Sequence, residues 1–274
     1  MATIRELERG VWLDSAVVPE SFRHDAEMLC HLLSDCVADL VVSLSLFEQA
    51  QANRRVQTPP RVDANEWQQE SDRRREREAE LEAAAGLSRG DPNYWEKSEE
   101  IREQVRRQLQ REKWQRDGGP EAYRRRLVFI HARSFVTTLA VFQRALIALC
   151  DYGFESGVAG GLERARDVFA VAIPGLKGVR DSTAHLEDRV RGQRQRGAEI
   201  RPAPIVNSFI HAPGGGVMVT EALNNNRYGG TIADGTYAEV EVSDAITEIA
   251  ETAAQACFDA LPWRPGHRIR EPST

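Results

Sequence analysis

The sequence has 274 residues, a net charge of -6 at pH 7 and an isoelectric point near 5.7, so it can bury a core without disulfides or metals. This acidic balance argues against binding duplex DNA through a uniformly basic surface, but it does not exclude a local basic patch. Cys30, Cys36, Cys150 and Cys257 stand outside any CxxC or Cys/His array. We therefore expect reduced, buried thiols in a cytoplasmic protein, with no metal site and no cofactor.

The N-terminal segment is charged and lacks the apolar run of a signal peptide. The longest apolar stretch, residues 127–150, is interrupted by histidine and arginine side chains. A membrane-spanning helix needs about 18 or more apolar residues with few charges. We therefore expect a soluble cytoplasmic protein that does not cross a membrane.

Apolar residues recur at three- and four-residue spacing over 18–55, which predicts a long helix. The expected core stripe of that helix is Phe22, Met28, Leu29, Leu32, Leu33, Cys36, Val37, Leu40, Val41, Leu44 and Phe47. Residues 66–117 then alternate acid and base at helical pairing distances. This pattern predicts two solvated helices, broken at 86–92, within a charged excursion over 56–118.

Two further roles for residues 66–117 stay open beside that of a solvated extension. A nucleic-acid-binding arm is one, although the interleaved glutamates nearly cancel the arginines. Recruitment of a protein partner through the charged helices is the other.

The second half begins with a helix that is apolar nearly all round from residue 127 onward. Short β-branched or alternating runs after Gly192, separated by glycine and asparagine turns, predict antiparallel hairpins in an insertion over 200–242. Ser243 or Asp244 should cap the last helix, and a Pro-rich tail over 262–274 should follow it. The expected elements are helices over 121–150, 162–173, 176–191 and 245–261, a loop over 157–161, and strands over 205–211, 217–223, 227–232 and 236–242.

The helix predicted over 176–191 opens on the motif segment, Arg180-Asp181-Ser182-Thr183-Ala184-His185, which continues into Leu186-Glu187-Asp188-Arg189. Arginine presents a planar fork of donors that fits phosphate oxygens. Histidine can take a proton from a hydroxyl near neutral pH and return it to a leaving group. The segment therefore combines residue types suited to chemistry on a phosphate.

Helical geometry constrains how this segment could act. If Val179, Leu186 and Val190 face the core, Arg180 lies about 120° to one side of Leu186 and His185 about 100° to the other. The two side chains could then converge only over the solvent side of the helix, and a second surface, such as that of a dimer, would have to complete the site.

The side chains of Asp181 and His185, four residues apart, could touch directly. The alternative to a phosphate-directed role is a surface ladder of ion pairs, Asp181 with His185 and Glu187 with Arg191. Such exposed pairs contribute only about 0.2–1 kcal/mol each.

In the predicted order of elements, two long helices enclose a charged excursion. A shorter helix and then a helix that opens on Arg-Asp-x-x-x-His follow them. This order resembles that of the HEPN superfamily. Arg180, Asp181 and His185 occupy the positions of its motif. The run Ala184 to Arg189 and the β insertion before the last helix look like uncharacterised bacterial HEPN-like proteins. The resemblance covers residues 18–55 and 121–192. It implies a mainly α, HEPN-like antiparallel helical bundle, as a single domain over 1–274.

Catalytic branches of that superfamily cleave RNA without a metal in a cleft between two protomers. The resemblance implies a homodimeric, metal-independent endoribonuclease, related to toxins or defence proteins. His185 would be the base or acid, Arg180 would hold the scissile phosphate and Asp181 would orient His185, with Glu187, Asp188 and Arg189 supporting them.

Other HEPN members are non-catalytic nucleotide-binding or protein-interaction modules, and this alternative stays open. No Gly-x-Ser-x-Gly elbow, metal-ligand cluster or dinucleotide fingerprint is present in the sequence to indicate a different hydrolase.

Overall fold

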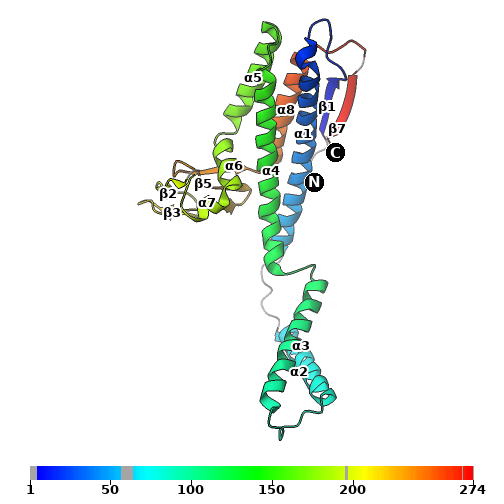
Figure 1. Cartoon of the computed structure of the whole chain (residues 1–274), viewed down its shortest axis with the longest axis vertical. Helices are drawn as coiled ribbons and strands as arrows, with labels where there is room; N and C mark the ends of the chain where they lie inside the picture. Colours follow the sequence, from blue (N-terminus) through cyan, green and yellow to red (C-terminus); the bar gives the residue numbers. More distant parts are fainter. Residues whose placement is uncertain (1–4, 57–63, 195–196, 267, 274) are drawn as a thin grey trace. The chain divides into compact units, whose positions relative to one another are not determined.

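The computed structural model describes residues 5–56, 64–194, 197–266 and 268–273. The chain divides into two compact units. The first comprises Met1–Gln49 together with Val128–Thr274, and the second comprises Ala50–Leu127. The protein is mainly helical with short antiparallel strands, as the sequence predicts (Figure 1).

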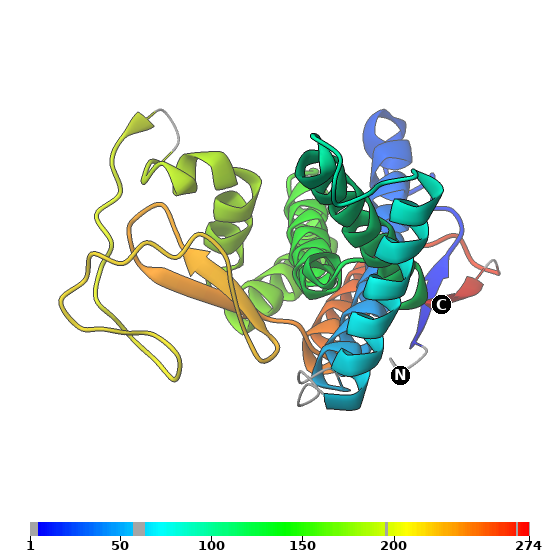
Figure 2. The same cartoon turned by 90° about the horizontal axis from the view of Figure 1, so that it is seen from below.

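Long helices form the body of the first unit, and both views show α1, α4 and α8 running alongside one another (Figures 1 and 2). These helices are α1 (Glu20–Val56), α4 (Glu121–Cys150), α5 (Ser156–Ala172) and α8 (Asp244–Ala260). The predicted helices over 18–55, 121–150 and 245–261 are confirmed to within two residues. Ser243 is the N-cap of α8, because its Oγ accepts a hydrogen bond from the backbone amide of Ile246.

Most of the predicted core stripe of α1 is buried, including Leu33, Leu40 and Phe47. Met28 and Leu32 are exceptions, because their side chains are 53% and 37% exposed. They line a shallow surface groove together with Tyr152 and Ala148. The apolar residues of α1 therefore cover a wider arc than the neighbouring elements bury.

The loop predicted over 157–161 is wrong, because α5 begins at Ser156 and includes these residues. The glycines that suggested a loop lie in a helix that packs against α8. A Cβ added at Gly161 would lie only 2.6 Å from the Cβ of Ala260. Glycine therefore allows a close helix contact here.

The strands predicted over 227–232 and 236–242 are confirmed as β5 (Arg227–Thr231) and β6 (Tyr237–Glu241). With β4 (Ala222–Asn224) they form a three-stranded antiparallel sheet in the order β4-β5-β6. The strand predicted over 217–223 is therefore wrong before residue 222. There, the Val219 carbonyl accepts a hydrogen bond from the Thr231 amide, and the Val219 amide donates one to Thr231 Oγ1.

The strand predicted over 205–211 is two short paired strands, β2 (Ile205–Val206) and β3 (His211–Ala212). The side chain of Asn207 accepts hydrogen bonds from the amides of Phe209 and Ile210. An asparagine turn of this kind replaces the extended backbone that the β-branched residues favour.

The tail predicted over 262–274 is also corrected. Residues Arg268–Ser273 form β7, which pairs antiparallel with β1 (Arg5–Gly10). A Cβ added at Gly10 would lie 2.5 Å from the Trp263 side chain. No local sequence pattern indicates the pairing of β1 with β7, which joins segments near the two ends of the chain.

The four cysteines are free thiols. Burial raises the pKa of Cys36 and of Cys257 to about 12, and it also raises the pKa of Cys30 and Cys150. These thiols therefore stay protonated and unreactive at neutral pH.

Two helices of the described chain, α1 over Glu20–Asn53 and α4, are long and apolar enough to cross a membrane by length and composition alone. Half of the most apolar window of α1 and 44% of that of α4 are buried inside the protein. Core helices of soluble proteins have the same properties, so this feature is weak evidence for a membrane span.

The second unit contains an antiparallel hairpin of α2 (Ala64–Ala84) and α3 (Tyr94–Arg116). Two helices broken at 86–92 are confirmed. The seam between them buries Ser71, Ser98 and Val105, and the Ser98 hydroxyl donates to the carboxylate of Glu82 over 2.7 Å. Charged side chains cover the outer faces and form i,i+3 and i,i+4 ion pairs.

Candidate functional site

The motif segment lies at a break between two helices. The single helix predicted over 176–191 is wrong, because α6 (Leu176–Ala184) ends and α7 (Leu186–Val190) begins on either side of His185. His185 has φ -120° and ψ 46°, outside the helical region. Figure 2 shows α6 and α7 beside the β4-β5-β6 sheet, and α6 contacts β5 and β6.

Hydroxyl groups within the segment explain the break. Ser182 Oγ donates to the carbonyl of Thr231 in β5 over 3.1 Å. Thr183 Oγ1 donates to the carbonyl of Val179, four residues earlier, over 2.8 Å. A threonine that bonds back to the preceding turn bends a helix, and the serine ties the end of α6 to the sheet.

The break changes which residues of α7 point inward. Val190, expected in the core, is 70% exposed, whereas Arg189 is only 2% exposed. The Arg189 guanidinium donates from Nε to Ser182 Oγ (3.1 Å) and from Nη1 to the carbonyl of Gln193 (2.6 Å). Arg189 therefore supports the segment by holding α7 against α6, and Val179 is buried as predicted.

Arg180 and Asp181 form an ion pair, with Nη1 and Oδ1 3.0 Å apart. The Arg180 side chain is 23% exposed, and its Nε is buried with no hydrogen-bond partner in the described part of the chain. The family resemblance implies that Asp181 orients His185. The structure pairs the Asp181 carboxylate with Arg180, and Asp181 contributes to His185 through the backbone bond that ends α6.

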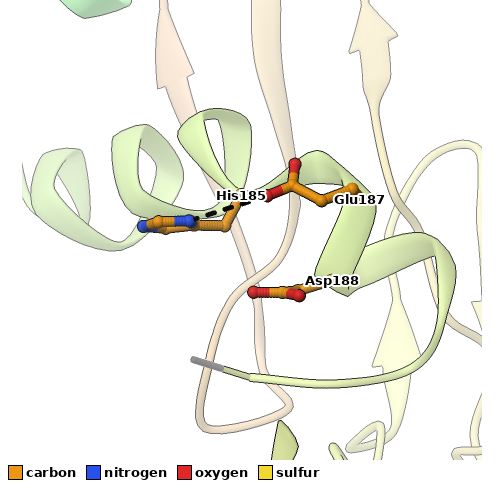
Figure 3. A group of neighbouring side chains, drawn as sticks. All are labelled: His185, Glu187 and Asp188. Carbon is orange, nitrogen blue, oxygen red and sulfur yellow. Dashed lines mark ion pairs between the residues drawn. The ribbon is translucent and has the colours of Figure 1, made fainter. Parts of the chain in front are cut away.

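His185 is partly exposed at the break, with 41% of its side chain accessible. Its Nδ1 lies 3.9 Å from Glu187 Oε1, and Figure 3 shows the other ring nitrogen pointing away from Glu187. Glu187 thus faces His185 instead of forming the predicted pair with Arg191. The sequence-predicted residues His185, Glu187 and Asp188 are therefore gathered at one turn.

The ligand atoms of His185, Glu187 and Asp188 all lie within 4.8 Å of one another, so they could hold a metal ion (Figure 3). One imidazole nitrogen and two carboxylates suit a divalent transition metal. The sequence predicts no metal at this segment, and assays with EDTA or with added divalent metal test that prediction.

A partly buried polar network that sequence reasoning missed lies next to the segment. Glu221, with a side chain 9% exposed, accepts hydrogen bonds from Arg133 Nη2 (2.6 Å) and from the Tyr228 hydroxyl (2.9 Å). Thr183 Oγ1 is 3.4 Å from the same tyrosine hydroxyl. Burial, followed by the Glu221 charge, raises the pKa of Tyr228. Because Arg133 and Glu221 are 88 residues apart in the chain, no local pattern pointed to their contact.

Comparisons with known proteins gave no relatives. No family model matches the sequence, no curated protein matches it, and no solved structure matches the fold. The functional argument therefore rests on the residues of this chain.

Proposed function

We propose that the protein is a cytoplasmic, metal-independent endoribonuclease built on a HEPN-like helical bundle and related to toxins or defence proteins. One observation carries the proposal. His185 stands partly exposed at a helix break, with a carboxylate facing one ring nitrogen and the other nitrogen directed away from it. A histidine used as general acid or base needs this combination of access and orientation.

The proposed reaction is an internal attack of the ribose 2'-hydroxyl on the adjacent phosphorus. His185 takes the hydroxyl proton as the 2'-oxygen bonds to phosphorus and the bond to the 5'-oxygen breaks. The products are a 2',3'-cyclic phosphate and a free 5'-hydroxyl, whose proton comes from an acid. A second His185, from another copy of the chain, is the acid in this scheme.

Arg180 is the proposed phosphate ligand. Its guanidinium is held by Asp181 over 3.0 Å in the free protein. A phosphate oxygen matches this fork of donors as well as a carboxylate does, and it would displace or share the contact with Asp181. In this scheme Asp181 positions Arg180, whereas Glu187 orients His185.

A homodimer is part of the proposal, because no hydrogen bond or ion pair joins Arg180 to His185 in the described part of the chain and 41% of the His185 side chain is open to solvent. A second protomer would exclude water and supply the second acid-base group. The expected substrate is single-stranded RNA, since its 2'-hydroxyl can reach the in-line position for attack.

The test incubates purified protein with mixed single-stranded RNAs in EDTA. Wild-type protein and the control His211→Ala, which replaces another exposed histidine, should both cleave, and His185→Ala should not. Adding excess His185→Ala protein to wild-type protein should lower the activity per wild-type chain if two copies share a cleft, because a mixed dimer has only one His185. Equal behaviour of wild type and His185→Ala would refute the proposal. Cleavage only after Zn²⁺ or Mn²⁺ is added would refute metal independence and favour a metal at His185, Glu187 and Asp188.

A non-catalytic HEPN-like module that binds nucleotides or a protein is the second candidate. The separate partners of the two motif side chains favour it. Arg180 pairs with Asp181 and His185 faces Glu187, so a phosphate bound by Arg180 would need no contact with His185. Nucleotide binding that depends on Arg180 but not on His185, without RNA cleavage, would support this alternative.

A further inference from the structure

A groove of about 350 Å³ lies between α2 and α3 in the second unit, near the start of α2 and the end of α3. Its volume is in the range of small-molecule sites, so it suits about one nucleotide unit rather than a duplex. It is lined by Trp67, Glu70, Ser71, Arg73, Arg74, Arg106, Leu109, Glu112, Lys113 and Arg116. Five of these ten residues are basic and two are acidic, so the groove attracts anions.

Charge is unevenly distributed along this hairpin. Residues 105–117 contain five basic and two acidic side chains, whereas residues 76–104 contain four basic and nine acidic ones. The charges over 66–117 nearly cancel in sum, but one end of the hairpin is basic and the other is acidic. Because α2 and α3 run antiparallel, Arg73 and Arg74 lie at the same end as Arg106 and Lys113.

The basic side chains of the groove are available for exchange with a ligand. Arg73 is exposed and makes no ion pair within the described ranges of the chain. Lys113 pairs with Glu70 over 3.1 Å and Arg106 with Glu103 over 2.7 Å, but these side chains are 39–64% exposed. Exposed pairs of this kind are weak, so a phosphate can replace the carboxylate at little cost.

An aromatic side chain accompanies the cations. Trp67 lines the groove with 58% of its surface exposed. Burial in the hairpin seam does not account for a tryptophan left open in this way. Nucleobases stack on exposed aromatic rings while arginine and lysine contact the phosphates, which is the usual combination in single-strand binding.

We infer that this groove binds single-stranded RNA, with a base stacked on Trp67 and phosphates held by Arg73, Arg106 and Lys113. The inference goes beyond the proposed function, because binding here requires no cleavage at His185. An acidic polypeptide would satisfy the cations but has no ring to stack on Trp67, so RNA fits the groove better.

The test uses the full-length His185→Ala protein, which should leave RNA intact, and a fluorescein-labelled 20-nucleotide oligouridylate. Binding is followed by fluorescence anisotropy at 50 and 200 mM salt. Trp67→Ala should weaken binding about 5-fold or more, and Trp67→Phe should retain most of it. Arg73→Ala combined with Arg106→Ala should weaken binding and reduce the slope of log K against log salt by about 1 to 2.

Matched control substitutions lie outside the groove on the same hairpin. Trp95→Ala removes a 75% exposed tryptophan of α3, and Arg77→Ala combined with Arg102→Ala removes two exposed, paired arginines. These variants should bind as the parent does. Circular dichroism and melting temperature check that each variant is folded.

No binding of RNA, or equal losses in the groove and control variants, would overturn the inference. The inference would also be overturned if polyglutamate bound as tightly as RNA and Trp67→Ala did not weaken RNA binding, since the groove would then be a general anion surface. Wild-type protein that cleaves RNA but lacks this binding would leave the proposed function standing. If RNA still binds the groove but His185→Ala does not reduce RNA cleavage, only the proposed function is refuted.

Discussion

Arg189 Nε donates a hydrogen bond to Ser182 Oγ over 3.1 Å, joining the two helices on either side of His185. Ser182 in turn donates to the carbonyl of Thr231 in the neighbouring sheet. A guanidinium that is 2% exposed thus fixes the geometry of the turn on which His185 stands.

Replacing Arg189 with alanine should lower the free energy of unfolding by about 2–4 kcal/mol, because it leaves a cavity and an unpaired Gln193 carbonyl. Urea denaturation measures the change. Arg191→Ala, which removes an exposed arginine from the following turn, should change the stability by about 0.5 kcal/mol or less. Similar losses in both variants would show that Arg189 does not hold the turn.

Adjacent glycines of α5 provide a second prediction. Gly161→Ala should destabilise the protein by about 1–3 kcal/mol, because its Cβ would lie 2.6 Å from that of Ala260 in α8. Gly160→Ala meets only Arg164 Nη1, at 3.5 Å, and should stabilise the helix by about 0.5–1 kcal/mol. Thermal melting should therefore shift in opposite directions. A shift in the same direction would contradict the close packing of α5 on α8.

The effects on stability of replacing Arg133 and of replacing Glu221 should be strongly coupled, because the two side chains contact each other. Glu221→Ala removes the acceptor of both Arg133 and Tyr228 and should cost about 2–3 kcal/mol, less than for a fully buried pair because Arg133 is one-third exposed. In a double-mutant cycle, Arg133→Ala together with Glu221→Ala should cost less than the sum of the two single changes. Strict additivity would show that the two side chains do not stabilise each other.

The sequence predicted the long helices well because their apolar periodicity extends over many turns, as in α1, α4 and α8. It could not predict the break at His185. That break depends on the bond from Ser182 to Thr231, 49 residues away, and on the burial of Arg189. Similarly, the pairing of β1 with β7 joins the two ends of the chain, and neither segment has a distinctive local pattern.

The candidate site was predicted in part. The residue types at Arg180 and His185 follow from the motif, but their partners do not. Continuous helical geometry favoured a contact from Asp181 to His185, whereas the broken helix pairs His185 with Glu187. The basic groove was missed because charges were summed along the chain, and only the antiparallel pairing of α2 and α3 brings Arg73 and Arg106 together.

His131 on α4 gives a prediction for pH dependence. Partial burial lowers the pKa of His131 below its usual value of 6.5, because desolvation disfavours the charged imidazole. The unfolded chain therefore binds a proton more readily than the folded protein. The contribution of His131 to stability is present above pH 6.5 and is lost as the pH falls through the folded-state pKa.

His131→Gln should remove this part of the pH dependence. The melting temperature of wild-type protein should fall more between pH 7.5 and pH 5.0 than that of the variant. Every other titrating group is common to both proteins, so the difference between the two curves isolates His131. His24→Gln, which changes an exposed histidine, is the control and should follow the wild type. Parallel curves for wild type and His131→Gln would show that His131 is not desolvated in the folded protein.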